Sequence, residues 1–156
     1  MLEITIPSRG VLNLSHIVLD YNGTLALDGV LVEGVGERLR ELAKHLDVHV
    51  ITADTYGDVA GRLADLPVTL STLSDHLQDE AKQRYVRTLS ARECVTVGNG
   101  RNDALMLAEA VLGLGVMQPE GLSRHALDAC DVVCPDINSA LDLLLKPKRL
   151  IATLRN

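Results

Sequence analysis

The chain alternates between short apolar runs and segments in which apolar residues recur every three or four positions. Short apolar runs between turn-forming residues are typical of buried strands, and the longer spacing is typical of helices with one buried face. Buried strands are predicted over six segments: 16–20, 47–52, 67–70, 93–97, 111–116 and 131–134. Helices are predicted between these strands, over 35–46, 56–63, 78–90, 102–110 and 121–129. We expect Pro147 to interrupt a last helix that begins near residue 137, because proline lacks the N–H that a helix interior needs.

The first fourteen residues follow a different pattern. Leu2, Ile4 and Ile6 alternate with polar residues, the turn-forming sequence PSRG follows, and VLNL completes the segment. This alternation with a period of two predicts a β-hairpin over residues 2–14. Because such a hairpin has an edge and an apolar face, we expect it either to contact another subunit of a homo-oligomer or to add an edge to the main sheet.

The alternation of strands and helices predicts an α/β fold. Right-handed βαβ units give a parallel, Rossmann-like sheet with helices on both faces, which is a three-layer arrangement. A chain of 156 residues suits one domain over 1–156, with residues 1–15 as an N-terminal hairpin extension. Ligands bind at the carboxyl ends of the strands in such folds, so the residues that follow each strand are the candidates for chemistry.

Polar residues gather after the predicted strands. Asp20 and Asn22 follow the first strand of the sheet, and Thr52 ends the second. The glycine-containing loop GNGRND, at 98–103, follows the fourth strand, and Lys82 lies near the start of the helix before that strand. We therefore expect a polar site at one edge of an otherwise aliphatic sheet.

Composition narrows the classes of function. Apolar residues make up 47% and charged residues 23%, which is typical of a globular protein and not of a disordered one. The net charge of −6 leaves no basic surplus for binding nucleic acid. No apolar run reaches the ~20 residues of a membrane span, and no signal peptide is visible. The three cysteines lack metal-ligand spacing and suit a reducing compartment, so the cytoplasm is the expected location.

Four segments, DYNGTLA, ITAD, DEAKQRYVRTL and VGNGRNDALML, resemble the four motifs of the haloacid dehalogenase (HAD) superfamily in order and spacing. The resemblance spans roughly residues 15–135. The last two segments are most similar to the phosphorylation domain of P-type ATPases, and in particular to the soluble P-type-ATPase-like group. No cap domain is expected, because a short hairpin and predicted helices account for residues 21–51 and 53–81. Without a cap, the site would need a large substrate or a neighbouring subunit to exclude water.

The resemblance implies a Mg²⁺-dependent phosphohydrolase that acts on a phosphorylated substrate through an aspartyl-phosphate. Asp20 would be the nucleophile, Thr52 would donate its hydroxyl to the phosphoryl oxygens, and Lys82 would offset the charge between carboxylate and phosphate. Such an offset is needed because two like charges ~4 Å apart repel by about 4 kcal/mol at an effective dielectric constant of roughly 20. The implied catalytic residues are Asp20, Asn22, Thr52 and Lys82. The implied phosphate-binding residues are Asp20, Gly23, Thr52, Ala53, Lys82 and Asn102, with backbone N–H groups of the Gly23 turn facing the phosphoryl oxygens. The implied Mg²⁺ ligands are Asp20, the carbonyl of Asn22, Asn99 and Asp103.

Two residues depart from the family pattern. HAD phosphatases usually have an aspartate at position 22 that acts as acid and base, and Asn22 cannot transfer a proton at neutral pH. They usually have a magnesium-binding aspartate at position 99, where Asn99 offers an oxygen without the charge. We therefore expect low turnover. The alternative is a catalytically impaired HAD-fold protein that acts by binding a phosphate ligand or a partner.

Structural roles remain open for the same residues. Thr52 could cap a helix that starts near Asp54, and Asp54 itself is more typical of a helix cap. Lys82 could be an ordinary solvated lysine, Asp103 could favour a helix dipole, and Asn99 could form a turn. We assign no role to the histidines, which show no ligand spacing: His16, His45, His49, His76 and His125. The glycines of LGLGV do not predict a dinucleotide site, because the third glycine of that motif is missing.

Overall fold

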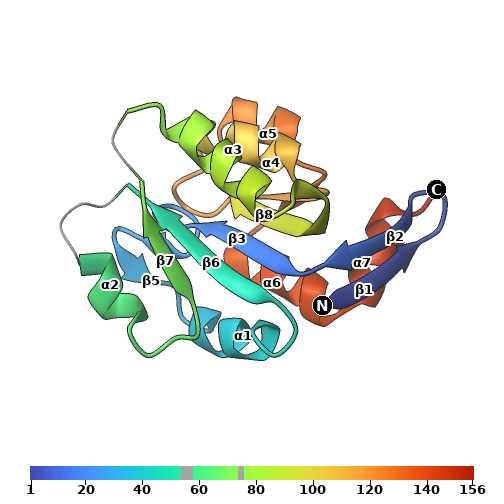
Figure 1. Cartoon of the computed structure of the whole chain (residues 1–156), viewed down its shortest axis with the longest axis horizontal. Helices are drawn as coiled ribbons and strands as arrows, with labels where there is room; N and C mark the ends of the chain where they lie inside the picture. Colours follow the sequence, from blue (N-terminus) through green and yellow to red (C-terminus); the bar gives the residue numbers. More distant parts are fainter. Residues whose placement is uncertain (54–57, 74–75) are drawn as a thin grey trace.

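The computed structural model describes residues 1–53, 58–73 and 76–156. Its main sheet has six strands: β3 (His16–Asp20), β6 (Asp47–Thr52), β7 (Thr69–Thr72), β8 (Cys94–Gly98), β9 (Leu112–Val116) and β10 (Val132–Cys134). All neighbouring strands are parallel, in the order β10-β9-β8-β3-β6-β7, of which Figure 1 labels the last four. The predicted α/β fold with a parallel sheet is confirmed, and β3 lies in its interior.

Helices cover both faces of this sheet. One layer contains α1 (Val35–Leu42), α2 (Asp58–Leu63) and α6 (Ile137–Leu145), and the other contains α3 (Gln78–Thr88), α4 (Ala104–Glu109) and α5 (Arg124–Ala129) (Figure 1). None of the helices within the described residues is both long and apolar enough to cross a bilayer. Short 3₁₀ turns, Ala91–Glu93 and Arg101–Asp103, precede β8 and α4.

Strand β3 is apolar on both sides because it is buried on both sides. Ile17 and Leu19 belong to the larger core cluster, on the face of α1 and α6, whereas Val18 packs with Val86 of α3 and Met106 of α4. Successive side chains of a strand point to opposite faces, which explains why this strand has no polar residue between His16 and its end. The burial fixes the strand, and with it the position of the residue that ends it.

Several helices and strands begin at other residues than the sequence predicts. Strand β7 begins two residues later than predicted, after Pro67, which cannot donate to a strand ladder. Pro147 does not merely interrupt the last helix: it occupies the first turn of a separate helix, α7 (Pro147–Leu154), a position where its missing N–H costs nothing. Helix α5 begins after Ser123, whose side chain accepts a hydrogen bond from the N–H of Ala126. The helix predicted over 56–63 is observed from Asp58, and residues 54–57 lie outside the described residues.

The predicted N-terminal hairpin is confirmed, but its expected packing is not. Strands β1 (Leu2–Ile6) and β2 (Gly10–Leu14) form their own antiparallel pair, so the hairpin adds no edge to the main sheet. Its apolar side chains are buried by the chain itself, where β1 contacts α7 (Figure 1). The apolar face that suggested a second subunit is therefore already covered, and the homo-oligomer stays a prediction without this support.

The glycines of β9 have a packing role. A Cβ atom on Gly113 would lie 2.5 Å from the carbonyl oxygen of Leu107 in α4, so only glycine lets this helix approach the strand. We expect Gly113→Ala to lower the free energy of unfolding by about 1–3 kcal/mol, because backbone must move. The control is Gly61→Ala in α2, where a Cβ would meet nothing within 4 Å. This control should raise stability by up to about 1 kcal/mol. Urea denaturation measures both, and equal effects would contradict the packing argument.

Candidate active site

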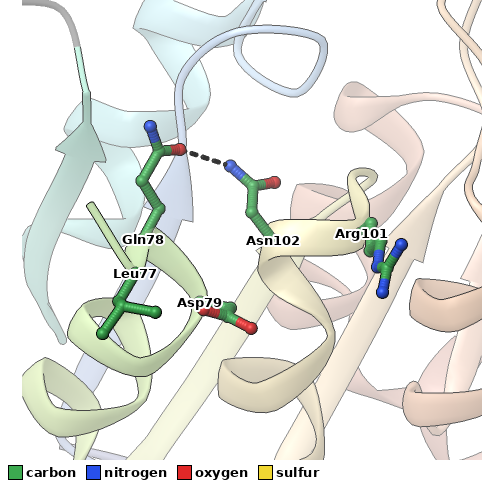
Figure 2. A pocket seen from close by; sticks show the side chains of 5 residues that line it. All are labelled: Leu77, Gln78, Asp79, Arg101 and Asn102. Carbon is green, nitrogen blue, oxygen red and sulfur yellow. Dashed lines mark hydrogen bonds between the residues drawn. The ribbon is translucent and has the colours of Figure 1, made fainter. Parts of the chain in front are cut away.

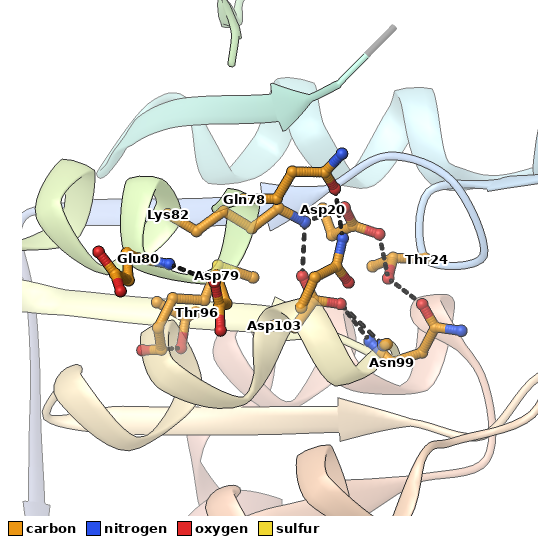
Figure 3. A network of polar contacts seen from close by, with 12 residues as sticks. Asp20, Thr24, Gln78, Asp79, Glu80, Lys82, Thr96, Asn99 and Asp103 are labelled. Carbon is orange, nitrogen blue, oxygen red and sulfur yellow. Dashed lines mark hydrogen bonds and ion pairs between the residues drawn. The ribbon is translucent and has the colours of Figure 1, made fainter. Parts of the chain in front are cut away.

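A buried cluster of opposite charges lies at the carboxyl end of the sheet. The Lys82 ammonium donates to Asp20 Oδ1 at 2.5 Å and to Asp103 Oδ1 at 2.6 Å (Figure 3). The exposed fractions are 7% for Asp20, 1% for Lys82 and 0% for Asp103. Buried charges need partners of opposite sign, and here one ammonium serves two carboxylates. The alternative of a solvated Lys82 is thereby excluded, whereas Asp103, although buried, also lies in the first turn of the 3₁₀ segment that precedes α4.

The loop after β8 places Asp103 in this cluster. The carboxylate oxygen Oδ2 of Asp103 accepts hydrogen bonds from the N–H groups of Asn99, at 3.0 Å, and Gly100, at 2.8 Å. This fold of the loop requires glycine at position 98, because a Cβ there would lie 2.6 Å from the Asp103 side chain. Both oxygens of Asp103 are thus engaged, one by the loop and one by Lys82.

The charge balance of the cluster shifts two pKa values. Burial, and then the Asp103 carboxylate, raise the pKa of Asp20 to about 7, although Lys82 and Thr24 oppose the shift. Burial alone would lower the pKa of Lys82, but Asp20 and Asp103 outweigh it and raise that pKa to about 12. The cluster therefore holds a firmly charged ammonium and one carboxylate in excess of it. Such a site favours an additional cation.

The turn after β3 carries Asp20 into the cluster. Gly23 has φ 78°, in the left-handed region, and its N–H donates to the Ala26 carbonyl at 2.8 Å. The N–H of Gly23 is therefore engaged within the turn, and the expectation that the turn presents backbone N–H groups to phosphoryl oxygens stays a prediction. The hydroxyl of Thr24 lies between two acceptors, 3.3 Å from Asp20 Oδ2 and 3.2 Å from Asn99 Oδ1 (Figure 3). Sequence reasoning gave Thr24 no role, although it follows the motif's glycine directly.

The other predicted site residues differ in how deeply they are buried. Thr52 is buried at the end of β6, the neighbour of β3, and the residue before it pairs in register with Asp20. Ala53 follows it at the same edge of the sheet and is partly buried, whereas Asn22 is exposed. Asp54, the suggested helix cap, lies outside the described residues.

Asn102 borders a pocket beside the cluster. This open pocket has a volume of about 430 Å³, and its lining residues come from the start of α3 and from the loop after β8: Leu77, Gln78, Asp79, Arg101 and Asn102 (Figure 2). The amide of Asn102 donates to Gln78 Oε1 at 2.9 Å, and Figure 2 shows Arg101 pointing away from this pair. Gln78 lies one helical turn before Lys82 in α3, and Asn102 directly precedes Asp103 in the loop after β8. The pocket therefore opens beside the charged cluster.

The donor set fits Mg²⁺ in part. Asp20 Oδ2 and Asn99 Oδ1 converge on the Thr24 hydroxyl, and carboxylate and amide oxygens are ligands that Mg²⁺ accepts. Lys82 and two backbone amides hydrogen-bond the two oxygens of Asp103 in this arrangement, and its role as a direct ligand stays a prediction. Across residues 1–53, 58–73 and 76–156, no three His, Cys, Asp or Glu side chains are grouped so that they could hold a metal.

Two histidines that appeared scattered in the sequence meet in the fold. His16 Nδ1 lies 3.2 Å from His49 Nε2, and His49 Nδ1 lies 3.0 Å from the Tyr85 hydroxyl. The first contact joins the neighbouring strands β3 and β6, and the second reaches α3, the helix of Lys82. Nothing in the sequence indicated this contact, because separation along the chain says nothing about which residues of neighbouring strands meet.

This histidine pair should make stability depend on pH. Burial, and then the neighbouring His16, lower the pKa of His49, so protonation costs more in the folded state than in the unfolded state. The free energy of unfolding is therefore unaffected by His49 above the pKa of a histidine in the unfolded chain, and it falls as the pH drops below about 6.5. We expect the wild type to lose more stability than His49→Gln between about pH 7 and about pH 5. Denaturation at a series of pH values tests this, and parallel curves for the two proteins would contradict it.

The loop after β9 forms hydrogen bonds with the turn that follows Asp20 and with the short hairpin after it. Gln118, after β9, donates its amide to the carbonyls of Gly23 and Thr24, both at 2.8 Å. Glu120 Oε1 accepts a hydrogen bond from the N–H of Asp28 at 3.1 Å. Asp28 lies between β4 (Ala26–Leu27) and β5 (Val30–Leu31), the short hairpin that follows the turn. Sequence reasoning missed both residues, because a loop with no periodicity gives no signal of what it contacts.

Comparison of the sequence with known proteins shows which proteins this chain is similar to. No protein-family model matches the sequence. The chain is 31% identical over 129 residues to a soluble P-type ATPase-like phosphatase of Methanocaldococcus jannaschii, and the match covers 79% of this chain and 46% of that protein. This chain thus spans about half the length of that relative. It is also 45% identical over 65 residues to the uncharacterised protein MJ0073 of the same organism, covering 42% of this chain and 70% of that protein.

Solved structures share the fold. One is 3-deoxy-D-manno-octulosonate 8-phosphate phosphatase from Moraxella catarrhalis, in complex with magnesium, phosphate and KDO; its TM-score is 0.69 at 18% identity, covering 92% of this chain and 95% of that one. Another is a zinc-transporting PIB-type ATPase, with a TM-score of 0.63 at 22% identity, covering 80% of this chain and 20% of that one. Together with the sequence relatives, they show that this chain has the fold of haloacid dehalogenase (HAD) hydrolases and of P-type ATPase phosphorylation domains, and that it is similar in sequence to a soluble P-type ATPase-like phosphatase.

Proposed function

We propose that this protein is a Mg²⁺-dependent phosphohydrolase that works slowly through an aspartyl-phosphate on Asp20. The observation that carries the proposal is the buried cluster in which Lys82 bridges Asp20 and Asp103 at the carboxyl end of a HAD-fold sheet. Such a cluster is costly to bury and stabilises the fold poorly for that cost, so a chemical role explains it better than packing does. The soluble P-type ATPase-like phosphatase among the relatives supports the same class of reaction.

The proposed reaction has two steps. An oxygen of the Asp20 carboxylate attacks the phosphorus of a phosphomonoester, and the bond from phosphorus to the leaving oxygen breaks. Water then attacks the phosphorus of the acyl phosphate, which releases inorganic phosphate and restores Asp20. Lys82 holds Asp20 in place and offsets the negative charge of the incoming phosphate, while Asp103 orients Lys82. Mg²⁺, when bound by Asp20, Asn99 and the carbonyl of Asn22, supplies further positive charge at the phosphate.

The pocket beside the cluster is where we place the leaving group. Gln78 and Asn102 offer it two amides, and the exposed side chain of Leu77 offers an apolar wall (Figure 2). The pocket is open to solvent, which fits the proposal of a single domain without a cap. Because no enclosing wall selects a shape here, we expect the pocket to discriminate little among phosphomonoesters by the shape of their leaving groups.

Asn22 explains the expected low turnover. The leaving oxygen must take its proton from water, since an amide is too weak an acid to transfer one at neutral pH, and the attacking water lacks a base at the same position. We expect Asn22→Asp to raise turnover about 10²-fold, at the lower end of what a positioned acid or base contributes. Steady-state hydrolysis of p-nitrophenyl phosphate measures this. An unchanged rate with metal shown to be bound would mean that Asn22 does not limit the reaction.

The proposed function is tested by phosphate release with and without Mg²⁺. Suitable substrates are p-nitrophenyl phosphate, acetyl phosphate and 3-deoxy-D-manno-octulosonate 8-phosphate. Mg²⁺-dependent release that EDTA abolishes is the expected result. No release from any of them, together with no beryllofluoride adduct, would favour the alternative of a HAD-fold protein that binds a phosphate ligand or a partner without turnover.

A further inference from the structure

A third carboxylate reaches the site from outside the four motifs. A Cβ atom built on Gly23 would lie 2.7 Å from Glu120 Oε2, 2.7 Å from Asn99 Nδ2 and 2.9 Å from Asn99 Oδ1. The Glu120 carboxylate and the Asn99 side chain therefore crowd the same point above the turn that follows Asp20. Glu120 comes from the loop between β9 and α5, in which no predicted site residue lies.

The groups expected to bind Mg²⁺ carry little negative charge without this carboxylate. The oxygens that converge on the Thr24 hydroxyl belong to one carboxylate, Asp20, and one neutral amide, Asn99. Asp103 is engaged by Lys82 and by backbone amides, as described above. A divalent cation held by a single carboxylate is bound weakly, because Mg²⁺ gives up its water reluctantly and relies on the charge of its ligands.

We propose that Glu120 supplies the Mg²⁺ site with the negative charge that Asn99 lacks. The inference rests on the proposed function, because it concerns the same cation. Glu120 is exposed to solvent as well as close to the Gly23 turn, so its carboxylate is accessible to a hydrated ion, and Mg²⁺ usually keeps several waters in proteins. In this proposal the negative charge comes from Glu120 in the loop after β9, and not from position 99 in the loop after β8.

The loop that carries Glu120 is fixed on both sides of the site. Gln118 donates to the carbonyls of Gly23 and Thr24, and its Oε1 accepts from the N–H of Ile137 at 3.2 Å. On the other side, Asn99 Nδ2 donates to the Gly121 carbonyl at 2.9 Å. Residues 118 and 121 are therefore both hydrogen-bonded beside the proposed ion site, and the backbone of Glu120 lies between these two anchored residues.

Glu120 also has a competing, purely structural role. Its Oε1 accepts from the N–H of Asp28 and so holds the β4–β5 hairpin beside the site. Glu120→Gln separates the two roles, because a glutamine oxygen can still accept that hydrogen bond while the charge is lost. Asp28→Asn is the matched control: it removes one exposed carboxylate from the same hairpin, and asparagine tolerates the left-handed backbone there, φ 50°.

The experiment measures binding, not activity. Mn²⁺ is titrated into the metal-free full-length protein, the free ion is followed by electron paramagnetic resonance, and bound Mn²⁺ is then displaced with Mg²⁺. We expect Glu120→Gln to weaken Mn²⁺ and Mg²⁺ binding about tenfold or more, as the loss of a charged group near a metal site commonly does. Asp28→Asn should change it less than about twofold, because the Asp28 carboxylate is exposed and its charge is screened by salt.

Three results bear on the proposal. Unchanged affinity in Glu120→Gln, or an equal loss in Asp28→Asn, would overturn it while leaving the proposed function intact, provided that Asp20→Asn still abolishes binding. Binding that survives Asp20→Asn would place the ion elsewhere and overturn both. Circular dichroism and thermal unfolding of Glu120→Gln without metal should match the wild type, so that a change in affinity reports the charge.

Discussion

Replacing Asp20 with asparagine is expected to lower Mg²⁺-dependent phosphate release by at least about 10⁴-fold, which is typical of the loss of a catalytic nucleophile. The amide has the size of the carboxylate, but its oxygen is too weak a nucleophile to form the acyl phosphate. Stability should not fall with activity, because burial and Asp103 already disfavour the charge of Asp20 in the fold, as its raised pKa indicates. Assays with p-nitrophenyl phosphate, together with thermal unfolding, measure both effects.

The control for Asp20→Asn is Asp65→Asn, which removes an exposed carboxylate far from any predicted motif. Its activity should equal that of the wild type. If Asp20→Asn retained more than about a hundredth of wild-type activity, an effect too small for loss of the nucleophile, the covalent mechanism would be wrong even if the protein proved to be a phosphatase.

Replacing Lys82 with methionine is expected to lower the free energy of unfolding by about 3–5 kcal/mol, because two buried carboxylates lose their shared partner. Urea denaturation measures this loss. The control is Lys44→Met, whose ammonium pairs with Glu41 at the surface, and its cost should stay below about 1 kcal/mol. A loss from Lys82→Met as small as that of the control would show that the buried cluster is not held as described.

Two additions should recover the stability of Lys82→Met. The double variant Lys82→Met with Asp103→Asn leaves one carboxylate, which can take up a proton, so it should be more stable than Lys82→Met alone. Mg²⁺ should stabilise Lys82→Met more than it stabilises the wild type, because the cation then replaces the missing ammonium. If Mg²⁺ stabilised neither protein, it would not bind near Asp103 and Asp20.

The sequence predicts the parts of the site that follow strand and helix ends. Asp20 could be placed because β3 is apolar on both faces and a parallel sheet brings its strand ends to one edge. Lys82 could be placed at the same edge because it lies near the start of the helix that precedes β8, although its role was implied only by the resemblance to the HAD superfamily. The positions, unlike the roles, need only local periodicity and the rule for where ligands bind.

Other features depend on contacts that no local pattern encodes. Glu120 reaches the Gly23 turn from a loop, and its approach is set by the three-dimensional path of residues 118–121. Asp103 could be predicted to lie at the site, but only the fold shows that both of its oxygens are engaged. The hairpin's apolar face could be recognised from its alternation, yet its partner, α7, comes from the far end of the chain. Contacts between residues that lie far apart in the sequence could therefore not be predicted from local patterns.

The most direct test of the account is to trap the phosphorylated protein. The protein is incubated with acetyl phosphate and Mg²⁺, quenched in acid, reduced with borohydride and digested, and the peptides are examined by mass spectrometry. Borohydride converts an aspartyl-phosphate into homoserine, so the account predicts this conversion at Asp20 in the wild type and none in Asp20→Asn. Conversion at another residue, or phosphate release with no conversion at Asp20 under conditions of steady turnover, would contradict it.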